Sequence, residues 1–131
     1  MAGESRPGPT LSTMPADPHP LTDPEDRKLL TLARSTRART RAAEGACVRD
    51  RDGRTYAAAT VALPSLRLSA VQVAVAMAVT SGARGLEAVV VLGEAAGPDD
   101  ADLAAVRDLG GPGVPVHLAG PDGTPVASVA S

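Results

Sequence analysis

The amino-acid sequence predicts an α/β protein, a three-layer α/β/α sandwich built on a mixed five-stranded sheet. Short β-prone runs alternate along the chain with segments of helical character, which is typical of helices packed on a sheet. Asp52-Gly53 lies between two β-prone runs, and an Asp-Gly pair in that setting is a strong hairpin signal. Residues 86–92, LEAVVVL, form a continuous apolar run of strand length, as expected of a strand covered on both faces.

The segment from Asp23 to about Arg39 is predicted to be the first helix. Asp23 suits the capping position, Pro24 suits the first helical position, and the two acidic residues that follow favour the positive end of the helix dipole. Four arginines cluster near the helix end, and two interpretations stay open: a solvated last turn that complements the dipole, or a patch for an anion or RNA. The net charge of -2 favours the first interpretation. The four residues are Arg34, Arg37, Arg39 and Arg41.

The longest apolar run lies between Pro64 and Gly82 and predicts a central helix from Ser69 to Thr80. Apart from Ser69, Gln72 and Thr80, every residue of this helix is Ala, Val or Met. A helix that is apolar all round is a buried helix. It is too short to span a bilayer, which requires about 20 apolar residues.

The elements on either side complete the prediction. A hairpin with strands at 45–50 and 54–63 precedes the central helix. After the strand at 86–92, a third helix is expected to begin at Gly97-Pro98-Asp99 and to end at Gly110-Gly111. Strands at 114–119 and 125–129 follow, and the strand–helix–strand order predicts a parallel crossover.

The composition indicates one domain with a core of small aliphatic residues. The chain has 131 residues, with no Phe, no Trp and only Tyr56 as an aromatic residue. Such a core requires close backbone approach and often gains burial by oligomerisation. The domain is expected at 23–131, after a Pro-rich arm at 1–22 that is predicted to be disordered.

Charge and cysteine content exclude several classes of function. A near-neutral chain without aromatic stacking residues is not expected to bind nucleic acid. The single cysteine, Cys47, rules out an internal disulfide and a Cys-based zinc cage. Because no apolar leader follows the N-terminus, a cytoplasmic location is expected, with no membrane association.

Three strings, together with the order of elements, resemble the cytidine deaminase family from about Pro24 to Ser128. They are EGACVRDRDGRTYAAATVAL (44–63), LSAVQVAVAMAVTSG (68–82) and GGPGVPVHLAGPDGTPV (110–126). In that family a first helix precedes a β-hairpin, an apolar helix begins with Cys-Ala-Glu or His-Ala-Glu, and Pro-Cys-x-x-Cys opens the third helix. The resemblance implies the cytidine deaminase-like fold and a zinc-dependent hydrolase that deaminates cytidine.

The motif positions hold residues that do not suit this chemistry. The resemblance places the zinc ligands at Ser69, Asp99 and Asp102, and the Glu that shuttles the proton at Val71. The ribose-contact positions hold Ala58 and Thr60. Valine has no titratable group, and removing a general acid/base typically lowers a rate by about 10²- to 10⁴-fold. We therefore predict no catalytic, substrate-binding or metal-ligating residue at these positions and no zinc cofactor.

Other interpretations of the same residues stay open. Asp99 and Asp102 are expected to cap the third helix, and Ser69 is expected to be a polar residue at a helix start. Alternatively, these three oxygen ligands would form a site that suits Mg²⁺ or Ca²⁺ better than Zn²⁺. Cys47 and His117 lie on predicted strands, and packing is the default expectation for both.

Two functional hypotheses follow. The first is a catalytically inactive pseudo-deaminase with a degenerate zinc site that serves a binding or assembly role. The alternative is a divergent cytidine or nucleoside deaminase or hydrolase with a non-standard metal site. The resemblance also implies a homo-oligomer, a dimer or tetramer, with the apolar helix Ser69–Thr80 at the subunit contact.

Overall fold

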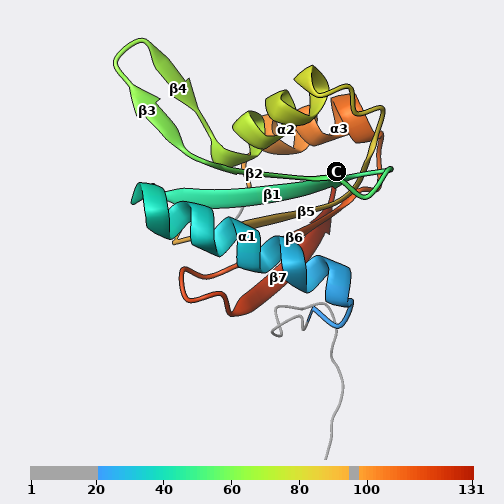
Figure 1. The fold of residues 1–131 in the computed structure, drawn as a ribbon, viewed down its shortest axis with the longest axis horizontal. Helices are drawn as coiled ribbons and strands as arrows, with labels where there is room; N and C mark the ends of the chain where they lie inside the picture. Colours follow the sequence, from blue (N-terminus) through green and yellow to red (C-terminus); the bar gives the residue numbers. More distant parts are fainter. Residues whose placement is uncertain (1–20, 95–97) are drawn as a thin grey trace, which may run out of the picture.

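A computed structural model describes residues 21–94 and 98–131, which form a mixed five-stranded sheet in the order β2-β1-β5-β6-β7 (Figure 1). β1 runs antiparallel to β2 and β5, β5 runs parallel to β6, and β7 closes the sheet antiparallel to β6. This arrangement confirms the predicted mixed sheet and parallel crossover. The elements are α1 (Pro24–Thr40), β1 (Glu44–Asp50), β2 (Thr55–Ala59), β3 (Val61–Leu63), β4 (Leu66–Leu68), α2 (Ala70–Thr80), β5 (Leu86–Gly93), α3 (Asp100–Gly110), β6 (Pro115–Ala119) and β7 (Pro125–Ala130).

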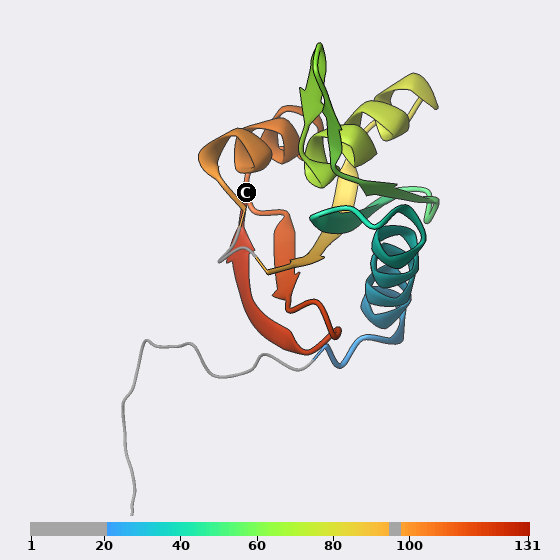
Figure 2. The same cartoon turned by 90° about the vertical axis from the view of Figure 1, so that its left-hand side faces the viewer.

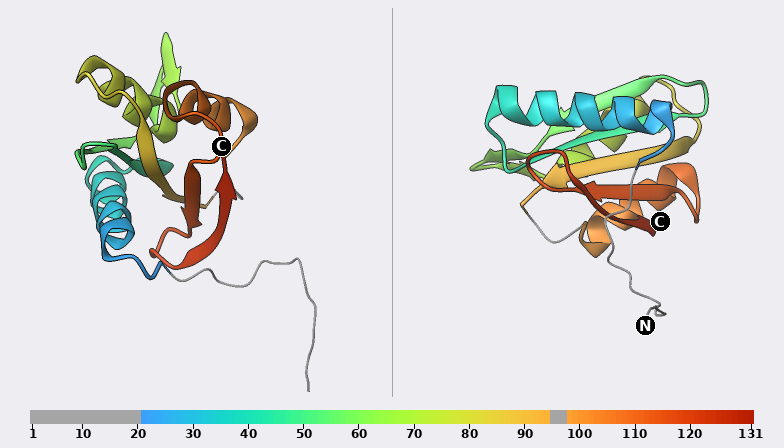
Figure 3. Two further views of the ribbon diagram at one scale, coloured as in Figure 1. Left: turned by 90° about the vertical axis from the view of Figure 1, so that its right-hand side faces the viewer. Right: turned by 90° about the horizontal axis from the view of Figure 1, so that it is seen from below.

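The helices cover opposite faces of the sheet, as the sandwich prediction requires. α1 packs on β1, β2 and β5, while α2 packs on the other face beside α3 (Figures 1 and 2). Seen from below, the hairpin of β6 and β7 lies beside α1 and not beneath its length (Figure 3). None of the described helices has the length and apolar character needed to cross a membrane.

Two aliphatic core clusters fill the spaces between sheet and helices, and burial of this apolar surface is the main stabilising term. The cluster under α1 contains Leu29 and Ala33, and its last member toward the N-terminus is Leu21, which is 8% exposed. The larger cluster lies under α2 and α3. A Cβ at Gly45 would collide with the carbonyl oxygen of Ala33, so glycine allows α1 to approach β1 closely.

The N-terminal boundary differs slightly from the prediction. The arm predicted at 1–22 lies outside the described residues except for its last two positions, and Leu21 there packs in the core. The start of α1 follows the prediction, since the Asp23 side chain accepts a hydrogen bond of 2.8 Å from the N–H of Glu25. The helix extends one residue beyond Arg39, to Thr40, and Arg41 follows as the C-cap in the left-handed conformation.

The predicted strand at 54–63 is wrong in one respect, because it is divided at Thr60. Its first part, β2, pairs with β1 around the predicted turn, and Asp50 accepts hydrogen bonds there from the N–H groups of Asp52 and Arg54. Its second part, β3, leaves the sheet and pairs only with β4. The β3–β4 hairpin projects from the body of the domain (Figure 1).

α2 is less buried than its composition predicts. Its N-cap is a capping box, in which Ser69 and Gln72 exchange hydrogen bonds of 3.1 and 3.0 Å between side chain and backbone. One side of the helix lies in the core, but Met77 is 38% exposed and Val79 is 54% exposed. The helix is apolar all round, yet only one layer of the sandwich covers it.

Candidate functional site

The residues at the three predicted zinc-ligand positions, Ser69, Asp99 and Asp102, meet at an open pocket of about 330 Å³. It lies at the N-terminal ends of α2 and α3, and its other walls come from the start of β1 and from the β3–β4 hairpin. Helix N-termini carry partial positive charge, which favours acidic side chains at this place. The pocket is lined by Ser69, Asp99 and Asp102 together with Glu44, Thr60 and Arg67, among others.

Ser69 uses its hydroxyl within the protein. Its Oγ accepts the N–H of Gln72 at 3.1 Å and donates to Asp102 Oδ1 at 2.5 Å. The expectation of a polar residue at a helix start is therefore confirmed. The bond to Asp102 adds a direct link between α2 and α3.

The two aspartates of α3 have different roles, although both were expected to cap the helix. Asp99 is the N-cap, and its Oδ1 accepts the N–H of Asp102 at 3.2 Å. Asp102 is only 3% exposed, and its carboxylate bonds Ser69 instead of a free helical N–H. Burial raises the pKa of Asp102, and the nearby Asp99 charge raises it further.

Glu44 is a pocket residue that sequence reasoning did not single out. It is the first residue of β1, and its backbone N–H donates to Thr60 Oγ1 at 3.0 Å. Burial raises the pKa of Glu44, and the charges of Asp102 and Asp99 act in the same direction. No local sequence signal marks this residue, because its acidic neighbours are more than fifty positions away.

The remaining motif positions contribute little chemistry to the pocket. Val71 has no exposed surface and belongs to the core cluster under α2 and α3. Ala58 is 4% exposed and lies in the same cluster. Thr60 lines the pocket, but its hydroxyl is occupied by the backbone of Glu44.

The donor set does not fit zinc. Catalytic zinc sites are built mainly from imidazole or thiolate ligands around an open position, whereas the three motif positions in this pocket offer one hydroxyl and two carboxylates, with no imidazole or thiolate. Ser69 and Asp102 are hydrogen-bonded to each other, so the two groups satisfy one another without a metal. Within residues 21–94 and 98–131, no group of three or more His, Cys, Asp or Glu side chains is placed to hold a metal ion.

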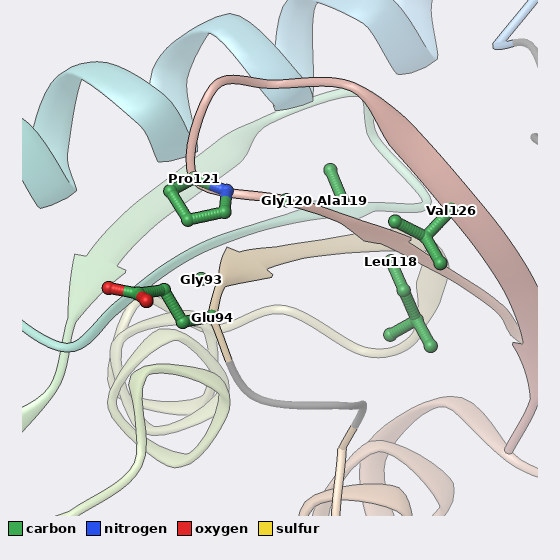
Figure 4. Close-up of a pocket in the computed structure, with 7 residues that line it drawn as sticks. All are labelled: Gly93, Glu94, Leu118, Ala119, Gly120, Pro121 and Val126. Carbon is green, nitrogen blue, oxygen red and sulfur yellow. The ribbon is translucent and has the colours of Figure 1, made fainter.

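A second hollow, of about 420 Å³, lies at the carboxyl ends of the parallel strands β5 and β6. Its lining is mainly apolar and includes Leu118, Pro121 and Val126. Among the described residues of the lining, Glu94 alone is ionisable, and its carboxylate points away from Leu118 and Val126 (Figure 4). The lining residues that the structure describes include no set of reactive side chains.

The fold and the pocket at the two helix N-termini place the protein in the class of α/β/α domains built like deaminases. The family model described as "Cytidine deaminase-like" matches residues 22–123, which is most of the chain. The chain therefore belongs to the cytidine deaminase-like family, as the sequence resemblance indicates. A comparison with curated proteins finds no match.

Solved structures of cytidine deaminases share the fold. The enzyme from Burkholderia pseudomallei superposes with a TM-score of 0.68 at 24% identity, over 80% of this chain and 90% of that one. The enzyme from Mycobacterium leprae gives 0.62 at 21% identity, with 81% and 94% covered. The enzyme from Mycobacterium tuberculosis gives 0.62 at 23% identity, with 79% and 90% covered.

Proposed function

We propose that this protein is a cytoplasmic pseudo-deaminase, a cytidine deaminase-like domain without zinc chemistry that serves a binding or assembly role. The observation that carries the proposal is Val71, which stands at the acid/base position and is fully buried in the core. A deaminase needs a group there that exchanges protons between water and the pyrimidine ring. The side chain of Val71, in the first turn of α2, is buried in the core and has no group that exchanges a proton.

The pocket supports the proposal independently. Ser69 donates its one hydroxyl proton to Asp102, and Ala58 offers no polar group to a ribose. The raised pKa values of Glu44 and Asp102 follow from burial and from mutual repulsion of carboxylates. The pocket thus lacks the imidazole and thiolate donors of a catalytic zinc site.

Metal analysis and turnover measurements on the purified chain test this proposal. We expect less than about 0.1 zinc per chain and no uridine formed from cytidine, because the soft ligands that zinc prefers are absent. As a positive control, the Ser69→Cys/Asp99→Cys/Asp102→Cys variant should bind zinc, since thiolates then stand at the ligand positions. Stoichiometric zinc in the wild-type chain, or uridine formation, would contradict the proposal.

The alternative enzyme hypothesis makes a separate prediction. If Ser69, Asp99 and Asp102 held a hard cation, Mg²⁺, Ca²⁺ or Mn²⁺ would raise the melting temperature of the wild-type chain, and Asp99→Ala would abolish the rise. We expect no such rise. Asp99→Ala should instead lower stability by about 1 kcal/mol with and without metal, because a cap is lost.

We further propose that the chain forms homo-oligomers through α2. The helix carries no charged residue, and a small apolar hollow of about 260 Å³ lies between Val79 of α2 and Leu109 of α3. A second copy fits because a symmetric contact would bury the exposed Met77 and Val79 of both copies.

Light scattering at micromolar concentration tests the assembly. Val79→Glu should shift the wild-type oligomer to a monomer, because it places a charge in the contact. Val126→Glu is the matched control, since Val126 is similarly exposed at 47% but lies on β7. A monomeric wild-type chain would count against the contact.

A further inference from the structure

A serine, a histidine and an aspartate from three separate elements lie next to one another in a row on the α1 face of the sheet. Ser128 on β7 stands opposite His117 on β6 in the strand register. Ser128 Oγ lies 2.7 Å from His117 Nδ1. His117 Nε2 lies 3.3 Å from Oδ2 of Asp26, in the first turn of α1. None of these three residues lines the pocket formed by Ser69, Asp99 and Asp102.

The carboxylate is held in place by further charges. Arg49 Nη1 lies 3.0 Å from Asp26 Oδ1, and Arg49 Nε donates to Glu87 Oε1 at 2.9 Å. The side chains of Asp26, His117 and Arg49 are only 15%, 10% and 12% exposed. Asp26 thus faces both the guanidinium and the imidazole from a sheltered position.

This geometry favours one tautomer of the imidazole. The contact between His117 Nε2 and Asp26 falls outside hydrogen-bond geometry. Because a carboxylate only accepts, the Nε2–H tautomer would place its hydrogen toward Asp26 and leave Nδ1 to accept from the Ser128 hydroxyl. A buried acid that orients a largely buried base, next to an accessible hydroxyl, is the arrangement that activates serine nucleophiles. The contact of 3.3 Å is long, as such contacts often are before substrate binds.

Exposure increases toward the nucleophile. Ser128 is exposed, whereas its base is 8% exposed as a residue. Asp26, Arg49 and Glu87 alone would be enough for a network whose only role is to join α1 to the sheet. Such a network does not need Ser128, because an exposed serine hydroxyl can form hydrogen bonds with water instead. The bond to His117 is therefore the feature that a structural role leaves unexplained.

The backbone of Ser128 also points to open space. Ser131 N–H donates to the carbonyl of Val114, so this pair is hydrogen-bonded in the antiparallel ladder. Because hydrogen-bonded and non-hydrogen-bonded pairs alternate, the pair of His117 and Ser128, three steps along, is non-hydrogen-bonded. The Ser128 N–H therefore faces the free edge of the sheet, since β7 is its last strand. It is available to stabilise the negative charge that develops on the ester carbonyl oxygen when Oγ attacks the acyl carbon.

We propose that Ser128 is an activated nucleophile that accepts acyl groups from carboxylic esters. Oγ forms a bond to the acyl carbon, and the hydroxyl proton passes to His117 Nδ1. The ester C–O bond then breaks, and His117 returns the proton to the departing alcohol. Asp26 is a positioning residue that holds the imidazole. With one backbone donor at an open edge, the site acylates slowly and retains the acyl group.

Covalent labelling of the full chain tests the proposal. A fluorophosphonate probe should add once per chain, at Ser128, as read by intact and peptide mass spectrometry. Ser128→Ala should abolish the adduct, and His117→Gln should slow it by about 10² or more. Ser65→Ala, at an exposed serine of the β3–β4 turn, is the matched control and should label like the wild type. Label spread over several serines at similar rates would overturn the proposal.

A cysteine replacement provides a second test that does not depend on how His117→Gln folds. Ser128→Cys should react with iodoacetamide at neutral pH about 10-fold faster than Ser65→Cys, because His117 removes the thiol proton. Equal rates for the two variants would refute activation. For Asp26, nitrogen NMR should show the Nε2–H tautomer of His117 in the wild type and a mixture in Asp26→Asn, whereas a role confined to packing would leave the tautomer unchanged.

Discussion

Val71 is the residue on which the proposed loss of deaminase chemistry depends, so its replacement by glutamate is the most informative change. Val71→Glu places the family's acid/base residue back at its position. If the side chain faced the pocket, glutamate would be tolerated there. Because Val71 has no exposed surface and packs in the core under α2 and α3, we expect the variant to be strongly destabilised.

The magnitude follows from two losses. Removing a fully buried valine side chain forfeits about 1.5–3 kcal/mol of burial. Burying a carboxyl group without a hydrogen-bond partner adds about 1–3 kcal/mol. The sum is about 2.5–6 kcal/mol, and a domain of this size loses about 4 °C or more per kcal/mol. The melting temperature should therefore fall by at least roughly 10 °C.

Urea unfolding followed by circular dichroism measures the change, with Val126→Glu as the control. Val126 is 47% exposed on the edge strand, so a glutamate there should alter the free energy of unfolding by less than about 1 kcal/mol. The reasoning is refuted if Val71→Glu is as stable as this control, or if it deaminates cytidine when zinc is added.

Three further predictions concern ionisable groups. Burial, together with the Asp99 charge, raises the pKa of Asp102. The free energy of unfolding should therefore decrease as pH rises from about 4 through the raised pKa of the folded state, where Asp102 ionises. Asp102→Asn should flatten this decrease, as measured by urea unfolding between about pH 4 and 8. Burial alone would raise the pKa of Asp50, but the hydrogen bond from Tyr56 and the bonds from backbone N–H groups lower it. The ionised Asp50 therefore stabilises the fold fully above about pH 4, and this stabilisation is lost as pH falls through the lowered pKa of the folded state. Tyr56→Phe should move acid unfolding to higher pH. Burial raises the pKa of the Cys47 thiol to about 12, so a thiol reagent should label the native chain at least about 100-fold more slowly than the denatured chain; equal rates would show that the strand opens readily.

The secondary structure was largely predictable because its signals are local. The caps at Asp23, Ser69 and Asp99 act within three residues, and the turn at Asp52-Gly53 acts within four. The break at Thr60 was missed, since strand propensity continues through it. Only the tertiary position of Thr60, whose hydroxyl binds the backbone of Glu44, explains why β3 leaves the sheet there.

The candidate site was predictable only in part. The resemblance located Ser69, Asp99 and Asp102, and the structure brings these three together at one pocket. It could not reveal that Asp102 bonds Ser69 and not a helical N–H, because that contact joins residues 33 positions apart. Glu44 was not predicted as a pocket residue, because it too is far in the chain from Asp99 and Asp102, which it approaches only in the folded structure.

By itself, the sequence determined the helices, most strands, the aliphatic core and the family, because each depends on short-range periodicity, on capping or turn residues, or on motif order. The tertiary structure decided which of those residues meet: the Ser69–Asp102 bond, the burial of Val71, and the approach of Asp26, His117 and Ser128 from three elements. Side-chain distances between remote elements are set by how helices settle on the sheet. No pattern confined to one stretch of chain encodes them.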